Sequence, residues 1–560
     1  MLMSLAAHSM ATAATHFSVK ARDGKARCGI LSTRNGSVET PAVLLYTRRG
    51  GPLNLTSPDM LATVTPPVQG IQLSVMQFLE NPDARILQEY GQGAHSFLCL
   101  EGFPILASNR DPTTYEYGMR PSTDKEVHVS IHSGGHMVSP ERYMATVAAL
   151  KPDLFVSLCD EVPADAKAKR VATSIKRTAA WLDACLQLHS TYQNRSGQVP
   201  TGEQEQSTEG GREVDPQRGG DSCNAGSAAC GSSNADGSGS ANNGSSSAGQ
   251  GPLAGSLLLA ALTGGGLVME RARAAAAVAV ADKEGVGGYA LCGLGAGEAP
   301  EQRPALIAAS LGALSPVSLE RRPVFVSGLS ASLEDMLTAV AEGVDLMDCA
   351  FVAQVTAGGY ALTFPLRPPK GWRPPASAAA PQQEQEAPPS SSLLGLAVAP
   401  GRGPDVSIGA DDTKVNLWST SYRLDKGPLL PGCSCFACRR HSRAYVHHLL
   451  NTHEMLADVL LEAHNTSHIN AFLQAIREAI TEGRFEEYCL WFRSLRSAPL
   501  VAPPRRSAAK RRASGEPSEP IESEPRTVEE TISGATEVAG QVERGSSGAR
   551  EHQQAKWVCV

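Results

Sequence analysis

Short apolar runs recur along the chain and alternate with segments whose apolar residues follow a helical spacing. The runs lack the strict apolar and polar alternation of a strand with one solvated face, so they predict strands buried on both faces. Two helix-start signals lie between such runs: Ser139 before Pro140, and Ser332 three residues before Asp335. The predicted strands span residues 41–46, 154–158, 257–262, 288–291, 324–327 and 344–347, and the two predicted helices continue to residues 150 and 341.

The repeated order of strand and then helix predicts a parallel sheet, either open or closed. A dinucleotide-binding open sheet would carry a Gly-x-Gly-x-x-Gly turn after an early strand, and the sequence has none there. About 400 of the 560 residues remain once low-complexity segments are set aside, which is enough for one large barrel with insertions. We therefore predict an α/β fold: a (β/α)8 barrel of the TIM type with a C-terminal helical subdomain and long disordered insertions.

Three segments have a composition that cannot bury a core. The first is rich in Ser, Asn and Gly, the second in Pro, Ala and Gln, and the third is a charged, Ser-rich tail. The resulting division is an N-terminal extension over residues 1–16, a first barrel part over 17–193, a disordered insertion over 194–251, a second barrel part over 252–367, a disordered insertion over 368–412, a C-terminal subdomain over 413–496 and a disordered tail over 497–560.

The charge of the chain limits the partners that it can bind alone. A formal net charge of −7 leaves no basic excess to hold a phosphate backbone, so any nucleic-acid contact is expected to be local or shared with a partner. The sequence has no uninterrupted run of 18 apolar residues, and no membrane span is predicted. The start of the chain lacks the basic region of a secretory signal, and the odd number of 13 cysteines favours a reducing compartment.

Three of the cysteines, Cys433, Cys435 and Cys438, lie within six residues. Their thiolates would repel one another, and a divalent ion such as zinc neutralises such a group, so the spacing predicts a metal site better than disulfides. Spacing alone leaves the fourth ligand open. An apolar face over 455–463 predicts a helix that ends on His464, where the imidazole can turn back onto the loop. The histidines that follow the cysteines are His441, His447, His448, His453, His464 and His468.

Acidic residues stand at the C-terminal ends of two predicted strands: Asp160 with Glu161, and Asp348. In barrels this rim gathers catalytic groups, although a strand-end aspartate equally serves to cap the next turn. Gly-rich turns over 263–266 and 292–298 follow two further strands and can bring backbone N–H groups close to a ligand. They are a weak signal, because such turns are common.

The segment 433–450, followed by Leu460-Leu-Glu-Ala-His464-Asn465, resembles the zinc-binding end of the tRNA-guanine (queuine) transglycosylases. The resemblance covers about residues 17–492 apart from the low-complexity insertions. It implies one structural zinc ion per chain, held in a closed tetrahedron by Cys433, Cys435, Cys438 and His464. Further motifs that carry it are Ser-Pro-Glu at 139–141, Leu-Cys-Asp-Glu at 158–161, the turn at 294–298 and the segment 343–349.

The family contains a catalytic enzyme and, in eukaryotes, a paralogous accessory subunit that pairs with it. The enzyme's nucleophile begins an Asp-Cys-x-x-Pro-Thr-Arg motif, of which this chain keeps Asp348 and Cys349 and lacks Pro-Thr-Arg. Asp160 stands where the family recognises the purine. The family's Asp-Ser-Gly-Gly-Phe-Gln loop, which supplies the acid/base aspartate, is replaced by a segment that begins at Ser108, and its Gln-Gly-Gly turn reads Thr-Gly-Gly at 263–265.

Segments 42–47, 174–177 and 354–356 look like the accessory subunit. The resemblance thus implies a non-catalytic chain that forms a heterodimer with a catalytic queuine tRNA-ribosyltransferase and meets tRNA through that complex. It would support exchange of guanine for queuine at the wobble position of tRNAs with GUN anticodons. No catalytic residue is expected, with Asp348 and Asp160 as vestigial candidates, and the chain by itself is not expected to be an enzyme.

Two alternatives stay open at this point. One is a catalytic transglycosylase with Asp348 as its nucleophile, and the other is a zinc-stabilised RNA-binding scaffold with no link to base exchange. The resemblance implies a cytoplasmic location, with the mitochondrial outer membrane as a second place of association.

Overall fold

The computed structural model describes residues 15–49, 51–52, 54–55, 61–80, 82–112, 121–131, 134–194, 251–279, 285–329, 332–374 and 413–495. Apart from their ends, the predicted insertions over 194–251 and 368–412 lie outside these ranges, as do most of the predicted extension over 1–16 and the whole predicted tail over 497–560. The domain boundaries therefore stay predictions.

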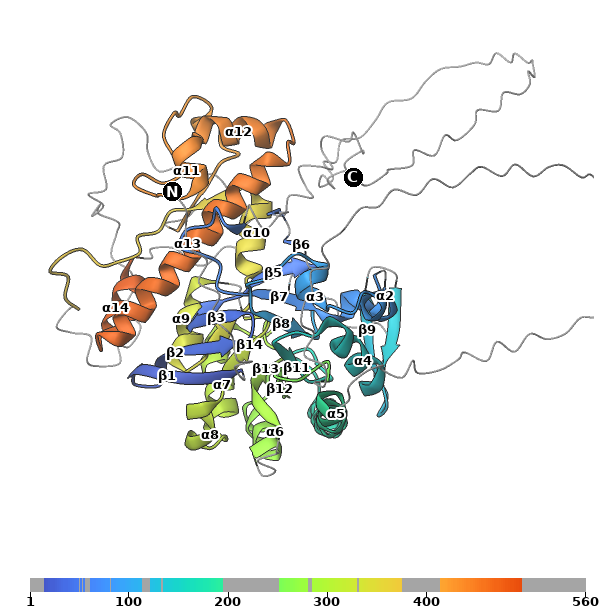
Figure 1. Cartoon of the computed structure of the whole chain (residues 1–560). Helices are drawn as coiled ribbons and strands as arrows, with labels where there is room; N and C mark the ends of the chain where they lie inside the picture. Colours follow the sequence, from blue (N-terminus) through green and yellow to red (C-terminus); the bar gives the residue numbers. More distant parts are fainter. Residues whose placement is uncertain are drawn as a thin grey trace, which may run out of the picture. The chain divides into compact units, whose positions relative to one another are not determined.

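The central sheet is built from short strands (Figure 1). The side chains of these strands for which burial is described are almost all buried. Each predicted apolar run coincides with or overlaps at least one strand, so these predictions are confirmed. In chain order the strands are β4 (Ala42–Val43), β5 (Leu45–Arg48), β6 (Gly51–Pro52), β7 (Ile71–Ser74), β8 (Ile105–Ser108), β11 (Leu154–Val156), β12 (Leu257–Leu262), β13 (Val286–Leu291), β14 (Val324–Val326) and β15 (Leu346–Met347).

The strands close into a barrel. Their order is β4-β15-β14-β13-β12-β11-β8-β7-β5-β6, and the pairs are parallel except for β6 against β5. β4 and β5 are parts of one strand interrupted at Leu44. The Leu44 amide donates to the Met347 carbonyl (2.8 Å), and the Leu45 amide donates to the Gly70 carbonyl on the other side (2.9 Å). Both ends of the sheet therefore meet at this strand, and the predicted (β/α)8 barrel is confirmed.

Helices follow the strands and pack their apolar faces on the outside of the barrel. Both predicted caps are confirmed: the Ser139 and Ser332 hydroxyls accept the amides of Arg142 (3.3 Å) and Asp335 (3.1 Å). No helix in the described ranges is long and apolar enough to cross a bilayer. These helices are α2 (Ala84–Tyr90), α3 (Ala94–Phe97), α4 (Pro140–Leu150), α5 (Ala168–Asn194), α6 (Val268–Ala279), α7 (Arg303–Gly312), α8 (Pro316–Arg321), α9 (Leu333–Ala341) and α10 (Ala350–Gly358).

The amino end of the barrel is covered by a meander of β1 (His16–Asp23), β2 (Ala26–Thr33) and β3 (Gly36–Thr40). Its Leu31 joins the interior cluster of the barrel. Arg27 reaches from β2 to Asp345, directly before β15, and its Nε donates to the carboxylate at 2.9 Å. Both side chains are buried, so this end is sealed and the opposite, carboxyl end of the strands forms the mouth.

The described part of the C-terminal segment adds four α-helices and one strand, which pairs antiparallel with a strand at residues 360–362. One long helix, α13 (Leu456–Thr481), runs past the strands with α11 and α12 at one end and α14 at the other (Figure 1). Its first turns share a core with α11 and α12, whereas its later turns join the main core of the barrel. The remaining elements are β16 (Tyr360–Leu362), β17 (Lys414–Asn416), α11 (Phe436–Arg440), α12 (Arg443–Asn451) and α14 (Phe485–Ser494).

The prediction that this helix ends on His464 is wrong, because α13 continues to Thr481. Its buried apolar positions extend through Phe472 and Ile476, and a helix persists while such a face finds a partner. The expected apolar start was also misplaced. Met455 is 69% exposed and precedes the first turn.

Candidate metal centre and barrel mouth

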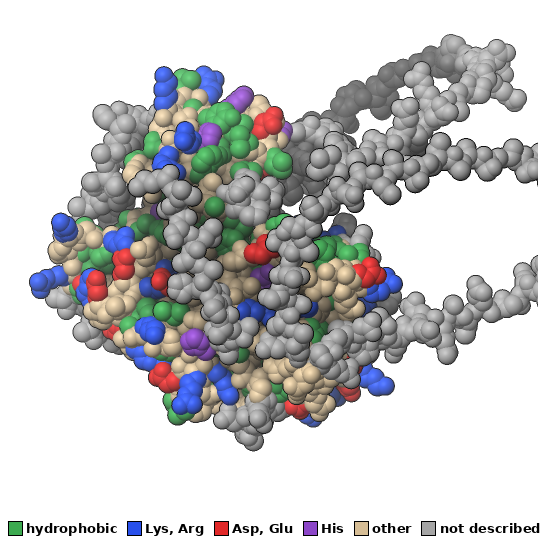
Figure 2. All heavy atoms as spheres, in the orientation of Figure 1, with side chains coloured by type: hydrophobic (Ala, Val, Ile, Leu, Met, Phe, Trp, Pro, Cys, Tyr) green, Lys and Arg blue, Asp and Glu red, His purple; other side chains and the backbone are tan. Residues whose placement is uncertain are grey.

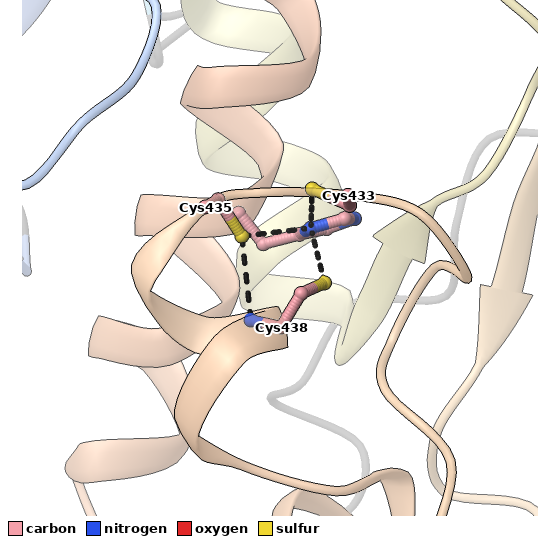
Figure 3. Close-up of side chains that lie close together, drawn as sticks. Cys433, Cys435 and Cys438 are labelled. Carbon is pink, nitrogen blue, oxygen red and sulfur yellow. Dashed lines mark hydrogen bonds between the residues drawn. The ribbon is translucent and has the colours of Figure 1, made fainter.

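Three sulfur atoms converge on one imidazole nitrogen in the C-terminal segment (Figure 3). Cys433 and Cys435 lie on the loop before α11, and Cys438 lies in its first turn. Their Sγ atoms are 3.8, 3.4 and 3.4 Å from His464 Nδ1, in that order along the chain. The predicted histidine is thus the one that the fold brings to the cysteines.

The other face of the imidazole shows which nitrogen is free to act as a ligand. His464 Nε2 lies 2.8 Å from the Leu362 carbonyl, which can only accept, so Nε2 carries the proton and Nδ1 presents its lone pair to the sulfurs. Asn465 fixes the same contact: its Oδ1 accepts the Leu362 amide at 2.9 Å, and its Nδ2 donates to the Tyr360 carbonyl at 3.0 Å. This pair of residues ties α13 to β16.

The electrostatics of the cluster favour a cation. Hydrogen bonds from Cys435 and Cys438 lower the pKa of the Cys433 thiol well below its ordinary range. Burial would lower the pKa of His464, but the Cys433 and Cys435 sulfurs outweigh burial and raise it to about 9. A positive charge is therefore stabilised at this point, whether a proton or a metal ion carries it.

The spacing of the donor atoms matches tetrahedral coordination. Zinc bonds of about 2.3 Å to sulfur and about 2.1 Å to nitrogen place neighbouring S and N ligands roughly 3.6 Å apart. The separations of 3.4 to 3.8 Å bracket that value. Cys435, Cys438 and His464 are buried and Cys433 is partly exposed, so the cluster can hold a metal ion with little access for a substrate.

The carboxyl end of the barrel gathers the other predicted residues. Asp160 follows β11 and Asp348 directly follows β15, and each is 1% exposed. Ser108, at the end of β8, is equally buried. Thr263 follows β12, and its hydroxyl has no hydrogen-bond partner in the part of the chain that the structure describes. The rim is thus assembled as predicted, with one side chain from each of several strands.

Two arginines of the same chain neutralise Asp160. Arg170 of α5 donates two hydrogen bonds to the two carboxylate oxygens, each at 2.7 Å. Arg177, also of α5, adds a third at 3.3 Å. Sequence reasoning missed both arginines. They are seven residues apart and therefore lie on one face of the helix that follows Asp160. This spacing could have indicated that both arginines face the same carboxylate.

Asp348 is held by backbone amides. Its Oδ2 accepts the Gly328 amide at 2.5 Å, and its Oδ1 lies 3.5 Å from the Ala350 amide. Ser108 accepts from Gln72 Nε2 (3.1 Å) and lies 3.0 Å from the Arg110 carbonyl. A hydroxyl cannot shuttle a proton near neutral pH as a carboxylate does.

Arg110 crosses the mouth from the loop after β8. Its Nη1 donates to Glu161 Oε2 at 2.9 Å and to the Leu294 carbonyl, on the turn after β13, at 3.3 Å. The same nitrogen would stand 3.2 Å from a Cβ added at Gly328, after β14. One guanidinium therefore spans the ends of several strands, in the part of a TIM barrel where substrates bind.

Comparison with known proteins agrees with the resemblance seen in the sequence. Residues 23–210 and 246–497 match the family described as Queuine tRNA-ribosyltransferase. A Xenopus tropicalis protein named queuine tRNA-ribosyltransferase accessory subunit 2 is 31% identical over 473 residues, which are 82% of this chain and 94% of that protein. The human protein of that name is 28% identical, over 81% of this chain and 92% of its own length.

A queuine tRNA-ribosyltransferase of the bacterium Solidesulfovibrio magneticus is also similar, at 24% identity over 84% of this chain and 95% of its own length. The family match covers far more than half of the chain, on both sides of the segment 211–245. The chain belongs to the queuine tRNA-ribosyltransferase family.

Proposed function

We propose that this chain is the non-catalytic accessory subunit of a queuine tRNA-ribosyltransferase and forms a heterodimer with a catalytic subunit. In that complex it supports exchange of guanine for queuine at the wobble position of tRNAs with GUN anticodons. The vertebrate relatives that are named accessory subunit 2 support this proposal. Its proposed compartment is the cytoplasm, with the mitochondrial outer membrane as a second place of association.

The observation that carries the proposal is that two arginines pair with both carboxylate oxygens of Asp160. A carboxylate that reads a purine must offer its oxygens to the N–H groups of the base, and here Arg170 and Arg177 occupy both oxygens. Displacing the arginines would leave the buried Asp160 carboxylate unpaired, which costs several kcal/mol. A neutral base cannot repay that cost with hydrogen bonds of about 1 kcal/mol each.

The loss of proton transfer supports the same conclusion. Base exchange needs an acid to protonate the leaving guanine, and Ser108 occupies that position with a hydroxyl already held in hydrogen bonds. Asp348 keeps a nucleophilic carboxylate, but its Oδ2 is engaged by the Gly328 amide. A nucleophile cannot complete base exchange when no acid protonates the leaving guanine and no carboxylate is available to recognise the purine.

For the Cys433, Cys435, Cys438 and His464 cluster we propose one structural zinc ion per chain. Three thiolates and an imidazole suit zinc better than hard cations. With four protein ligands the tetrahedron is complete, so the ion would hold α11 to α13 and to β16 without acting on substrate.

The chemistry of the surface fits a chain that meets tRNA through a partner. On the face shown in Figure 2, basic and acidic side chains are mixed over the barrel helices, whereas hydrophobic side chains gather over the C-terminal helices. Met455 (69% exposed) and Leu456 (39% exposed) belong to that segment. Exposed apolar side chains of this size favour a protein partner.

The test is incorporation of labelled queuine or guanine into tRNA by the purified chain, by the catalytic subunit, and by both together. We expect no turnover by this chain alone and at least tenfold more in the mixture than with the catalytic subunit alone. Asp348→Asn, which keeps the shape of the side chain, should leave that stimulation unchanged.

Asp348 favours one other candidate, the catalytic transglycosylase. Turnover by the chain alone that disappears in Asp348→Asn would establish that alternative and overturn the accessory role. Binding of tRNA without stimulation of the catalytic subunit would instead favour an RNA-binding scaffold.

A further inference from the structure

A second group of metal-ligating side chains lies in the barrel mouth, apart from the C-terminal cluster. Cys159 follows β11 and Cys292 directly follows β13, and their Sγ atoms lie within 4.8 Å of each other and of a Glu161 carboxylate oxygen. Cys159 is 5% exposed and Cys292 is fully buried. Two strand ends that are not neighbours in the sheet thus direct their thiols to one point.

The surrounding donors orient these atoms as the second shell of a metal site does. Asn109 Nδ2 donates to Cys159 Sγ at 3.0 Å and also to the Ser157 carbonyl at 3.0 Å. Glu161 divides its carboxylate: Oε2 accepts from Arg110 at 2.9 Å, and Oε1 lies 4.0 Å from Cys159 Sγ. One oxygen therefore remains directed toward the thiols while the other is fixed by an arginine.

The charges of the group balance around a divalent ion. Two thiolates and one carboxylate carry three negative charges, which a divalent cation and the Arg110 guanidinium cancel. This balance matters because an uncompensated charge at such a buried position is costly. A hard ion such as magnesium would prefer oxygen ligands, whereas sulfur donors select zinc or a similar soft metal.

We propose that Cys159, Cys292 and Glu161 bind a second zinc-type divalent ion in the barrel mouth. Three protein ligands leave a fourth position open, in contrast to the closed C-terminal cluster. Thr263 follows β12, the strand between the two cysteine-bearing strands, and its buried hydroxyl has no hydrogen-bond partner among the described residues. The proposal does not depend on the accessory function, because it concerns binding by this chain alone.

The test is the metal content of the full chain, purified under reducing conditions without oxygen and freed of loosely bound metal. We expect elemental mass spectrometry to find two zinc ions per chain. The Cys159→Ser/Cys292→Ala variant and the Cys438→Ala variant should each retain one. Cys185→Ala removes another fully buried thiol, on α5 and outside both groups, and should retain two.

Cobalt substitution supplies a measurement that counts sulfur ligands. Charge-transfer absorption should correspond to five thiolate–cobalt bonds in the parent chain and to three in the Cys159→Ser/Cys292→Ala variant. Glu161→Gln should weaken the affinity of the second ion about tenfold or more and leave the first unchanged.

A single zinc ion in the unmodified chain would overturn the proposal. This result does not depend on whether any variant folds. A second ion that persists in the Cys159→Ser/Cys292→Ala variant would place that ion elsewhere and overturn the proposal too. So would a disulfide between Cys159 and Cys292, found by mass spectrometry after alkylation of the cell lysate.

Discussion

Asp160 in the barrel mouth and the C-terminal cysteine cluster are both buried groups that carry negative charge, but they are neutralised differently. Asp160 receives its counter-charges from Arg170 and Arg177 of the same chain. The three cysteine sulfurs converge on His464, whose single imidazole cannot balance three thiolates. The first site is therefore neutralised by the chain itself, whereas the second can accept a cation from outside.

This difference separates two kinds of retained residue. A side chain can keep its identity and lose the function that its family gives it, because a new neighbour takes its hydrogen-bonding capacity. Under the proposed function Asp160 is an example of this case, and His464 is an example of the opposite one, in which the Leu362 carbonyl engages Nε2 and leaves Nδ1 facing the sulfurs. Neighbours, as well as identities, must be compared when a family member is judged active or inactive.

The largest expected effect is at the cysteine cluster. Cys438→Ala removes a candidate ligand, so the ion of this cluster should be lost and the C-terminal segment destabilised by about 5 kcal/mol or more. Zinc content and limited proteolysis measure both effects. Cys489→Ala, at a buried thiol of α14 outside the cluster, is the matched control and should keep its zinc. A Cys438→Ala protein with full zinc content and normal protease resistance would contradict our interpretation of this cluster.

The next effect concerns the cations around Asp160. Arg170→Ala/Arg177→Ala leaves a buried carboxylate unpaired and should lower the free energy of unfolding by about 3 kcal/mol. Adding Asp160→Asn should restore most of that loss, because a neutral amide needs no counter-charge. Chemical denaturation of the three proteins measures the difference. If the triple variant is no more stable than the double variant, Asp160 is not the group that the arginines neutralise.

The third effect is a dependence of the barrel's stability on pH. Burial lowers the pKa of His189, on α5 against β11, to about 4. The unfolded chain then binds this proton more tightly than the folded one, so stability should fall by about 3 kcal/mol as the pH drops from roughly 6.5 to 4. His189→Phe should flatten that part of the curve, followed by chemical denaturation at each pH. His448→Gln, at an exposed histidine of α12, serves as control and should leave the curve unchanged.

The smallest effect is expected for Arg110. Arg110→Ala removes the contacts to Glu161 and Leu294 and should cost about 1 kcal/mol, because the Glu161 side chain is not fully buried and water can reach it. Thermal denaturation measures this change. The zinc content of the C-terminal cluster should not change, and a loss there would show that the two regions are coupled more strongly than their separate cores suggest.

Much of the barrel could be predicted because most of its strands are continuous apolar runs. β7 and β8 were not found from that pattern, since β7 places Gln72 inside the barrel, where its amide pairs with Ser108 of β8. A polar residue that finds its partner on another strand has no local signature. The caps at Ser139 and Ser332 were found because their partners are three residues away.

The candidate sites divide in the same way. The three cysteines were visible from spacing, but His464 lies 26 residues after Cys438 and was selected only by the family resemblance. The pairing of Arg170 and Arg177 with Asp160 was not predicted, because the sequence does not show which carboxylate an arginine will contact. Local spacing predicts what one turn brings together, and longer contacts depend on the packing of the whole fold.

The contact between His464 and the Leu362 carbonyl also sets an order of events during synthesis. Every strand of the barrel precedes Leu362 in the chain, and His464, the last residue of the candidate metal cluster, follows it by about a hundred residues. The barrel strands therefore leave the ribosome while the cluster still lacks its imidazole. The C-terminal helices can then pack on the barrel only late in synthesis, and a shortage of zinc would leave chains whose barrel is formed but whose α11 is not fixed to α13.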